Sequence, residues 1–376
     1  MSTSPLHCFL AITFALLATA TGLSDDKQES SKEKTKRPSP VTSPTIDDDG
    51  SVTFRVQAAS AKEVFLTGEM VSGKAALTKG EHDIWSVTLQ DIKPGVYGYS
   101  FFVDGLQTLD GGNMNLKPMR SPRTSTLHLP GDNAFDFKDV PHGTVHYHGY
   151  QSQPINRFRE MQVYTPPGYE TSSESYPVLI LQHGHSDSFA TWTAYGKAHW
   201  ILDNLIASNK AVPMIVVMLD GHPIPESYGA GRSEDNTSEL ETDLIEVALP
   251  MVEKLYRVKS GSNHRAIAGL SMGGLHSLTI GLGHADQFRW IGAFSAAPPT
   301  MEATKKILED TDRLNENVKL LWIACGKEDF LLNENKRFIG QLKESGVQHQ
   351  WRLTEGNHSW PIWRGYLADF APLLFR

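Results

Sequence analysis

The hydrophobic and polar positions divide the chain into two regions of different periodicity. From Ser51 to Gly131, short runs alternate apolar and polar residues, and turn residues separate them at roughly ten-residue spacing. Such runs are typical of antiparallel strands with one face in a core, so they predict a small β-sandwich over residues 50–131. The runs are SVTFRVQA, KEVFLTG, IWSVTLQ, GVYGYSFFVDG and TSTLHLPG.

Beyond Phe158 continuous apolar runs alternate with segments of helical periodicity. Strands that are apolar throughout are buried on both faces, so this alternation predicts a parallel sheet covered by helices on both sides. We therefore expect an α/β domain over residues 158–376, joined to the sandwich by a connector over residues 132–157. The predicted strands are REMQVYTPP, YPVLILQHG, PMIVVMLDG, HRAIAGLS, RWIGAFSA, VKLLWIACG and HQWRLTEG; the predicted helices include AHWILDNLIASN, ETDLIEVALPMVEKLY, KKILEDTDRL and NKRFIGQLKES.

The N-terminal region has a different composition. The apolar run Phe9–Ala20 is too short to span a bilayer comfortably and ends in small residues, which predicts a signal peptide over residues 1–20. The preceding segment has no Lys or Arg, so a short membrane anchor is the alternative. Residues 21–49 are polar, charged and Pro-rich, which predicts a disordered linker. We therefore expect a secreted or periplasmic protein with no stable membrane span.

Composition narrows the function classes. The 376 residues are 40% hydrophobic and 21% charged, as in ordinary globular proteins, and the net charge of −8 argues against a nucleic-acid partner. Of two cysteines, Cys8 lies in the predicted signal peptide, so Cys325 has no partner for an intramolecular disulfide. We expect Cys325, in the run VKLLWIACG, to be buried rather than nucleophilic. The sequence leaves the oligomeric state open.

The segment Gly269–Gly273 reads G-x-S-x-G and lies between a predicted strand and a helix-like stretch. In this motif the chain turns so tightly that the positions two before and two after the serine must lack side chains. The turn lifts the serine hydroxyl above the sheet, and the following helix directs its N-terminus at a developing oxyanion. We therefore expect Ser271 to be a nucleophile and Gly269 and Gly273 to form its elbow.

A serine nucleophile needs a base and a carboxylate that orients it, and in this fold class both follow the serine along the chain. His276 and His284 belong to the elbow helix and its end, and His349 begins a strand. His358 follows the last predicted strand in the loop GNHSW, so it is the expected base.

The carboxylate is expected just beyond the preceding strand, where Glu328 and Asp329 are neighbours. Only one of the two side chains can point at a single imidazole. We favour Asp329, three residues past the glycine that ends the strand, and keep Glu328 as the alternative.

The remaining candidates surround this triad. The backbone N–H groups of Met272 and His185 are the expected oxyanion donors, with Gly184 letting the backbone turn. Trp192, Trp360 and Trp363 lie near catalytic loops, where each either packs or contacts an aromatic acyl group. Two His-x-His pairs occur without HExxH or CxxC, so we expect no metal and no other cofactor.

Several segments closely resemble the putative-esterase family, which includes feruloyl esterases of carbohydrate esterase family 1 and enterochelin esterase-like proteins. The resemblance extends from Val140 to Arg376 and implies an α/β-hydrolase fold with the triad on Ser271, Asp329 and His358. It is carried by LQHGHSDSFATW, DNLIASNKAVPMIVVMLDGH, HRAIAGLSMGG, IACGKEDF and GNHSWPIW.

The preceding region, with GVYGYSFFVDG and LDGGN, resembles the early-set immunoglobulin-like module related to carbohydrate-binding family 48. It departs from the family at Asp110–Asn113, where Gly replaces the usual Pro. A second departure is His185, where relatives often carry a smaller residue.

The resemblance implies a secreted serine carboxylesterase that hydrolyses esters of aromatic, feruloyl-type acids on plant-type polysaccharides. The alternatives are an enterochelin-type siderophore esterase, an acyltransferase and a non-catalytic carbohydrate-binding protein. The expected partner is therefore an ester substrate that is linked to carbohydrate.

Overall fold

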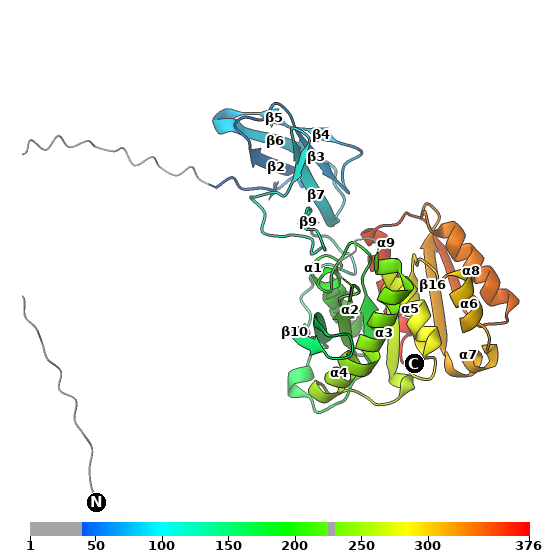
Figure 1. Ribbon diagram of the computed structural model, residues 1–376. Coiled ribbons are helices and arrows are strands. Elements are labelled where there is room, and N and C mark those ends of the chain that lie inside the picture. The colour runs from blue at the N-terminus through cyan, green and yellow to red at the C-terminus, as the bar shows by residue number, and fades with distance from the viewer. Residues whose placement is uncertain (1–39, 225–229) are drawn as a thin grey trace, which may run out of the picture. The chain divides into compact units, whose positions relative to one another are not determined.

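The computed structural model describes residues 40–224 and 230–376, and its largest element is an eight-stranded mixed sheet (Figure 1). The strand order is β10-β11-β13-β12-β14-β15-β16-β17. β11 runs antiparallel to both neighbours, and every later pair in this order is parallel. The bounds are β10 Thr144–Ser152, β11 Arg157–Thr165, β12 Val178–Gln182, β13 Ile215–Leu219, β14 Arg265–Leu270, β15 Trp290–Phe294, β16 Leu320–Gly326 and β17 Gln350–Thr354.

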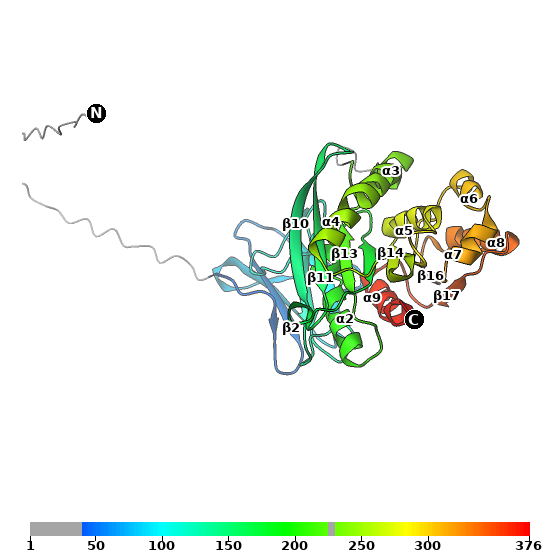
Figure 2. The same cartoon turned by 90° about the horizontal axis from the view of Figure 1, so that it is seen from below.

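Helices cover both faces of this sheet, and the central strands are therefore buried. Every residue of β12, β13, β15 and β16 is buried. One face packs against α3, α4, α5 and α8, and the other packs against α2 and α9 (Figure 2). This architecture confirms the fold class that the apolar strands predict. The helices are α1 Thr191–Ala194, α2 Ala198–Ala207, α3 Glu234–Asp243, α4 Leu249–Leu255, α5 Met272–Gly283, α6 Met301–Ile307, α7 Thr311–Asn317, α8 Leu332–Glu344 and α9 Trp360–Phe370.

The predicted helices differ from the observed ones mainly at their ends. The helix expected over residues 241–256 is α3 and α4 joined by a π-helical turn at Leu244–Ala248. The stretch KKILEDTDRL contains parts of two helices, because Asp310 accepts a hydrogen bond from the Arg313 N–H and starts α7. Helix α9 was not expected, although Pro361 in its first turn is a signal for a helix start.

The N-terminal domain consists of two antiparallel sheets around a separate core. One sheet has the order β1-β2-β6-β5, and the other has the order β4-β3-β7-β8 with β9 paired to the first half of β7. Phe54, Tyr99 and Phe101 are among the residues that fill the core between them. The immunoglobulin-like assignment stays a prediction. The strands are β1 Thr45–Ile46, β2 Val52–Gln57, β3 Val64–Gly68, β4 Ala75–Ala76, β5 Thr78–Lys79, β6 Ile84–Leu89, β7 Gly95–Val103, β8 Leu106–Thr108 and β9 Ser125–Leu129.

Two predicted boundaries are wrong. The predicted linker ends too late, because Thr45–Ile46 already pairs with β2 and the Ser43 hydroxyl donates a hydrogen bond to Asp110. The predicted connector over residues 132–157 contains β10, the edge strand of the large sheet. Its polar and aromatic sequence TVHYHGYQS is that of a strand with one exposed face, so it lacks the continuous apolar signal of the inner strands.

The predicted signal peptide and most of the predicted linker lie outside the described residues. Within residues 40–224 and 230–376, no helix combines the length and the apolar character that crossing a bilayer requires.

The sandwich and the α/β domain share buried contacts within one compact unit, Val41–Arg376. Val96 of β7 belongs to the same hydrophobic core as Trp192, Tyr195 and Trp360 of the α/β domain. The buried Tyr195 also donates its hydroxyl hydrogen bond to Glu69, just after β3. The two domains are thus joined by packing as well as by the chain.

Candidate active site

Ser271 lies at the sharp turn between β14 and α5. Its φ of 53° and ψ of −112° place a non-glycine residue in a region that side chains rarely adopt. Gly269 and Gly273 make this turn possible, because a Cβ on Gly269 would lie 2.5 Å from the Gly273 carbonyl oxygen. A Cβ on Gly273 would lie 2.6 Å from the carbonyl oxygens of Gln182 and His183. The structure thus shows the physical reason for both glycines of the motif.

We expect Gly273→Ala to lower the free energy of unfolding by about 1–3 kcal/mol, because the new methyl group overpacks against backbone that cannot move aside. Chemical denaturation monitored by circular dichroism measures the effect. Gly340→Ala in α8 is the matched control, since nothing lies within 4 Å of its ideal Cβ. That control should raise stability by up to about 1 kcal/mol. Equal stability of the two variants would contradict the clash at the elbow.

The imidazole of His358 joins Ser271 to Asp329. Its Nε2 lies 3.0 Å from Ser271 Oγ, and its Nδ1 lies 2.9 Å from Asp329 Oδ2 and 3.0 Å from Oδ1. An ionised carboxylate only accepts hydrogen bonds, so Nδ1 carries the proton and donates it. The unprotonated Nε2 is then left to accept the hydrogen bond of the serine hydroxyl. The three residues come from the ends of β14, β16 and β17, as the sequence predicts.

Asp329 is held ionised in a buried position. Burial alone would raise the pKa of this carboxyl, but hydrogen bonds from the His358 ring and the Leu331 N–H lower it below the ordinary value of 3.8. The Leu331 N–H donates to Oδ1 over 2.8 Å. The charge therefore persists at neutral pH and can stabilise a positive imidazolium beside it.

Glu328 points elsewhere. Its side chain is exposed and accepts a hydrogen bond from the Gly356 N–H, in the loop that leads to His358. The geometry therefore pairs Asp329, and not Glu328, with the imidazole. The Glu328 side chain instead links the loop after β16 to the loop after β17 by this hydrogen bond.

The three tryptophans proposed as substrate contacts are part of the core. Trp192, Trp360 and Trp363 are 1%, 2% and 6% exposed, so a substrate cannot reach their ring faces. Trp363 meets the His358 ring edge-on at 4.8 Å and supports its position. The positions of these tryptophans near catalytic loops in the sequence could not show whether their rings are buried or exposed. The exposed ring at the site is instead Phe330, which is 70% exposed and lies 4.4 Å from the His358 ring.

The backbone at Gly184 lies directly beside the serine. An ideal Cβ at this position would be 2.7 Å from Leu270 Cδ1 and 3.7 Å from Ser271 Cβ, so a larger residue here would force the Leu270 side chain to move. The Gly184 carbonyl accepts two hydrogen bonds, from His183 Nδ1–H at 2.8 Å and from the Asp187 N–H at 3.1 Å. In a trans peptide the N–H points opposite to the carbonyl, so the His185 N–H faces away from these donors.

His183 is itself fixed in one tautomer. The Gly221 N–H donates to its Nε2 over 2.8 Å, so Nδ1 must carry the proton that reaches Gly184. Sequence analysis gave no role in the site to Asp187 or Gly221. Their contribution is a hydrogen bond from the backbone, which side-chain identity does not signal.

Cys325 neighbours the Asp329 carboxylate and is buried, as predicted. Burial and the neighbouring charge of Asp329 raise the pKa of its thiol to about 12. The thiol is therefore protonated at neutral pH and is a poor nucleophile. Among residues 40–224 and 230–376, no three His, Cys, Asp or Glu side chains are arranged to hold a metal ion.

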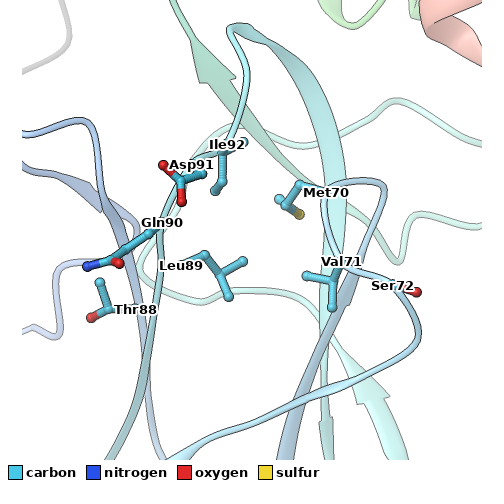
Figure 3. Close-up of a pocket in the computed structure, with 8 residues that line it drawn as sticks. All are labelled: Met70, Val71, Ser72, Thr88, Leu89, Gln90, Asp91 and Ile92. Carbon is cyan, nitrogen blue, oxygen red and sulfur yellow. The ribbon is translucent and has the colours of Figure 1, made fainter.

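A cavity of about 410 Å³ lies in the sandwich, between the loop after β3 and the end of β6 (Figure 3). None of its lining residues is aromatic, and none belongs to the triad. It therefore lacks the flat ring on which a sugar could stack. The lining residues are Met70, Val71, Ser72, Thr88, Leu89, Gln90, Asp91 and Ile92.

Comparisons with known proteins agree with this fold. The family model described as "Putative esterase" matches residues 152–374. The "Endo-1,4-beta-xylanase/feruloyl esterase" of Xylanibacter ruminicola is 31% identical over 345 residues, which is 89% of this chain. The chain spans only 46% of the length of that relative.

Solved structures extend the comparison. A ferulic acid esterase is 30% identical and superposes with a TM-score of 0.53, covering 62% of this chain and 98% of its own. The enterobactin esterase of Shigella flexneri is 17% identical with a TM-score of 0.62, covering 86% of this chain and 93% of its own. The second match shows a shared fold, and the family model shows kinship: the chain belongs to the esterase family described as "Putative esterase".

Proposed function

We propose that the protein is a serine carboxylesterase with Ser271 as nucleophile, His358 as general base and Asp329 as the residue that orients the base. The observation that carries the proposal is the single imidazole that bonds to both the serine hydroxyl and the buried carboxylate. A serine hydroxyl is a weak nucleophile without such a base.

The reaction follows from this geometry. Ser271 Oγ attacks the ester carbonyl carbon while its proton passes to His358 Nε2, and the Asp329 carboxylate stabilises the imidazolium that forms. The imidazolium then protonates the leaving alcohol, and an acyl-enzyme remains. A water molecule gives its proton to Nε2 and attacks the acyl carbon, which releases the acid and restores the serine.

The oxyanion of each tetrahedral intermediate needs donors that are in place before the reaction. We assign this role to the N–H of Met272, at the N-terminus of the twelve-residue helix α5, and to the N–H of His185. The helix dipole adds to the attraction for negative charge at this end.

For the substrate we propose esters of aromatic acids on carbohydrate. The relative from Xylanibacter ruminicola is described as a xylanase and feruloyl esterase, and a similar solved structure as a ferulic acid esterase. The exposed ring of Phe330 beside the imidazole is suited to stack an aromatic acyl group. We also propose that the protein is exported, on the basis of the apolar run Phe9–Ala20.

A siderophore esterase is the second candidate, since the enterobactin esterase fold covers 86% of this chain and so reaches into the sandwich. The test is a substrate screen of the purified full-length chain with methyl ferulate, p-nitrophenyl acetate, acetylated xylan and enterobactin. Preferred hydrolysis of methyl ferulate supports the feruloyl proposal. Preferred cleavage of enterobactin favours the second candidate, and turnover only with an added acceptor alcohol indicates an acyltransferase. No turnover of any ester leaves the non-catalytic alternative.

Replacing Phe330 tests the assignment of an aromatic acyl contact. We expect Phe330→Ala to raise KM for methyl ferulate about 3- to 10-fold, the range expected for the loss of one aromatic pair, and to leave kinetics on p-nitrophenyl acetate unchanged. Steady-state kinetics on both substrates measures this difference. Phe137→Ala is the matched control, because Phe137 is 62% exposed but stacks on His142. Equal effects on the two substrates would exclude stacking at Phe330.

A further inference from the structure

A segment of the N-terminal domain lies along the loop that carries the His185 N–H. Between β8 and β9, Met119 forms an antiparallel bridge with Asp187, and the Arg120 N–H donates to the Ser186 carbonyl over 3.1 Å. The Pro118 carbonyl accepts a hydrogen bond from the Thr191 hydroxyl. These contacts place residues 117–120 against residues 186–191 of the α/β domain.

Lys117 supplies a charge at this contact. Its ammonium lies 3.1 Å from Asp187 Oδ1, and the two side chains are only 13% and 3% exposed. The ammonium also lies over the rings of Tyr195 and Trp360, at 5.0 and 5.6 Å from their centres. A buried carboxylate needs such a partner, because removing the partner leaves an uncompensated charge in a low dielectric.

Asp187 connects this ion pair to the Gly184–His185 peptide, whose N–H is the proposed oxyanion donor. Its N–H is one of the two donors that hold the Gly184 carbonyl, and its Oδ2 lies 3.4 Å from the ideal Cβ position of Gly184. The same position is 3.7 Å from Ser271 Cβ. The Asp187 carboxylate and Ser271 therefore both lie beside Gly184, whose peptide to His185 carries the proposed oxyanion donor.

We infer that Lys117 is a positioning residue for ester hydrolysis: through Asp187 it fixes the Gly184–His185 peptide and neutralises a carboxylate beside the oxyanion. The inference rests on the proposed function, because it assigns the supporting structure of the same site. It makes the sandwich domain a part of the catalytic centre rather than only an attached module. The contribution is electrostatic and geometric, and Lys117 does not touch the reacting atoms.

Losing Lys117 should lower activity more than losing the Asp187 carboxylate, because only the first loss leaves a negative charge without a partner. Without Lys117, the ionised Asp187 would repel the developing oxyanion as well as lose its anchor. Without the Asp187 carboxylate, the loop loses the ion pair but no repulsive charge remains. Removing both should therefore be no worse than removing the carboxylate alone, because the two act through one interaction.

The test is a double-mutant cycle in the full-length chain with Lys117→Met, Asp187→Asn and the double variant. We expect kcat on p-nitrophenyl acetate to fall about 10- to 100-fold in Lys117→Met, less than the loss of a whole oxyanion donor. Asp187→Asn and the double variant should both fall by only about 3- to 10-fold, with KM within about twofold throughout, since ground-state binding is unchanged.

The inhibition constant of a transition-state analogue would not change if Lys117 had only a structural role. An aryl trifluoromethyl ketone forms an oxyanion on the serine, so its inhibition constant should rise in proportion to the fall in kcat/KM. Lys117→Arg should retain most activity. Lys79→Met is the matched control, because Lys79 also pairs with a carboxylate, Asp83, and lies over a ring, Trp85, but within the sandwich.

Unchanged kcat and inhibition constant in a folded Lys117→Met protein would overturn the inference while leaving the triad assignment intact. Additive effects in the double variant would also overturn it. If Lys117→Met does not fold, a loss of analogue affinity in folded Asp187→Asn supports the inference and an unchanged affinity refutes it. Failure of the proposed function is separable, because the unchanged protein would then hydrolyse no ester, or Ser271→Ala would retain hydrolysis.

Discussion

Ser271→Ala should lower kcat for ester hydrolysis about 10³-fold or more, as expected for removal of a triad nucleophile. The remaining imidazole and carboxylate then have no hydroxyl to activate, and only binding and oxyanion stabilisation would contribute. The fold should persist, because the substitution removes one oxygen from a partly exposed side chain. Steady-state rates of p-nitrophenyl acetate hydrolysis measure the loss of kcat, and circular dichroism verifies folding.

The control for this prediction is Ser208→Ala, at the end of α2, whose hydroxyl bonds only to the carbonyls of Asn204 and Leu205 among its described partners. It should hydrolyse the ester at the rate of the unchanged protein. A folded Ser271→Ala protein with near-normal turnover would remove the catalytic role of the serine, and with it the proposed mechanism.

Much of the site could be predicted because catalysis imposes a sequence order and a backbone geometry. The elbow needs glycines two residues either side of Ser271, and the partners must follow at the ends of later strands. The choice between Glu328 and Asp329 depended on side-chain direction, and there the structure supplied the reason. Asp329 points inward, whereas Glu328 reaches the Gly356 N–H.

The errors concern features that depend on distant parts of the chain. The burial of Trp192 and Trp360 follows from their packing against each other, and Trp360 also packs against Tyr195, which lies far from it in sequence. Strand β10 could be identified only from its pairing with β11, because its own residues are mostly polar. The contact between Lys117 and Asp187 joins two predicted domains, and no local pattern encodes it.

The pair Glu328 and Asp329 provides the sharpest test of the triad. We expect Asp329→Asn to lower kcat about 10³- to 10⁴-fold, because an amide cannot hold the imidazole in the tautomer that leaves Nε2 free. Glu328→Gln should change kcat less than about threefold, since the glutamine oxygen can still accept the Gly356 hydrogen bond. Hydrolysis of methyl ferulate and p-nitrophenyl acetate at saturating substrate measures both.

Stability against pH adds an independent check on the same carboxylate. The pKa of Asp329 is lowered in the folded state, so its ionised form stabilises the fold above the ordinary pKa of 3.8, and this contribution is lost as the pH falls through the lowered value. Asp329→Asn should therefore be less stable than the unchanged protein at pH 7 and should approach it in stability under strongly acid conditions. Urea unfolding at several pH values measures this convergence. If Glu328→Gln instead proves the more damaging to kcat, the orienting acid is Glu328, and the hydrogen bonds between Asp329 and His358 do not describe the active enzyme.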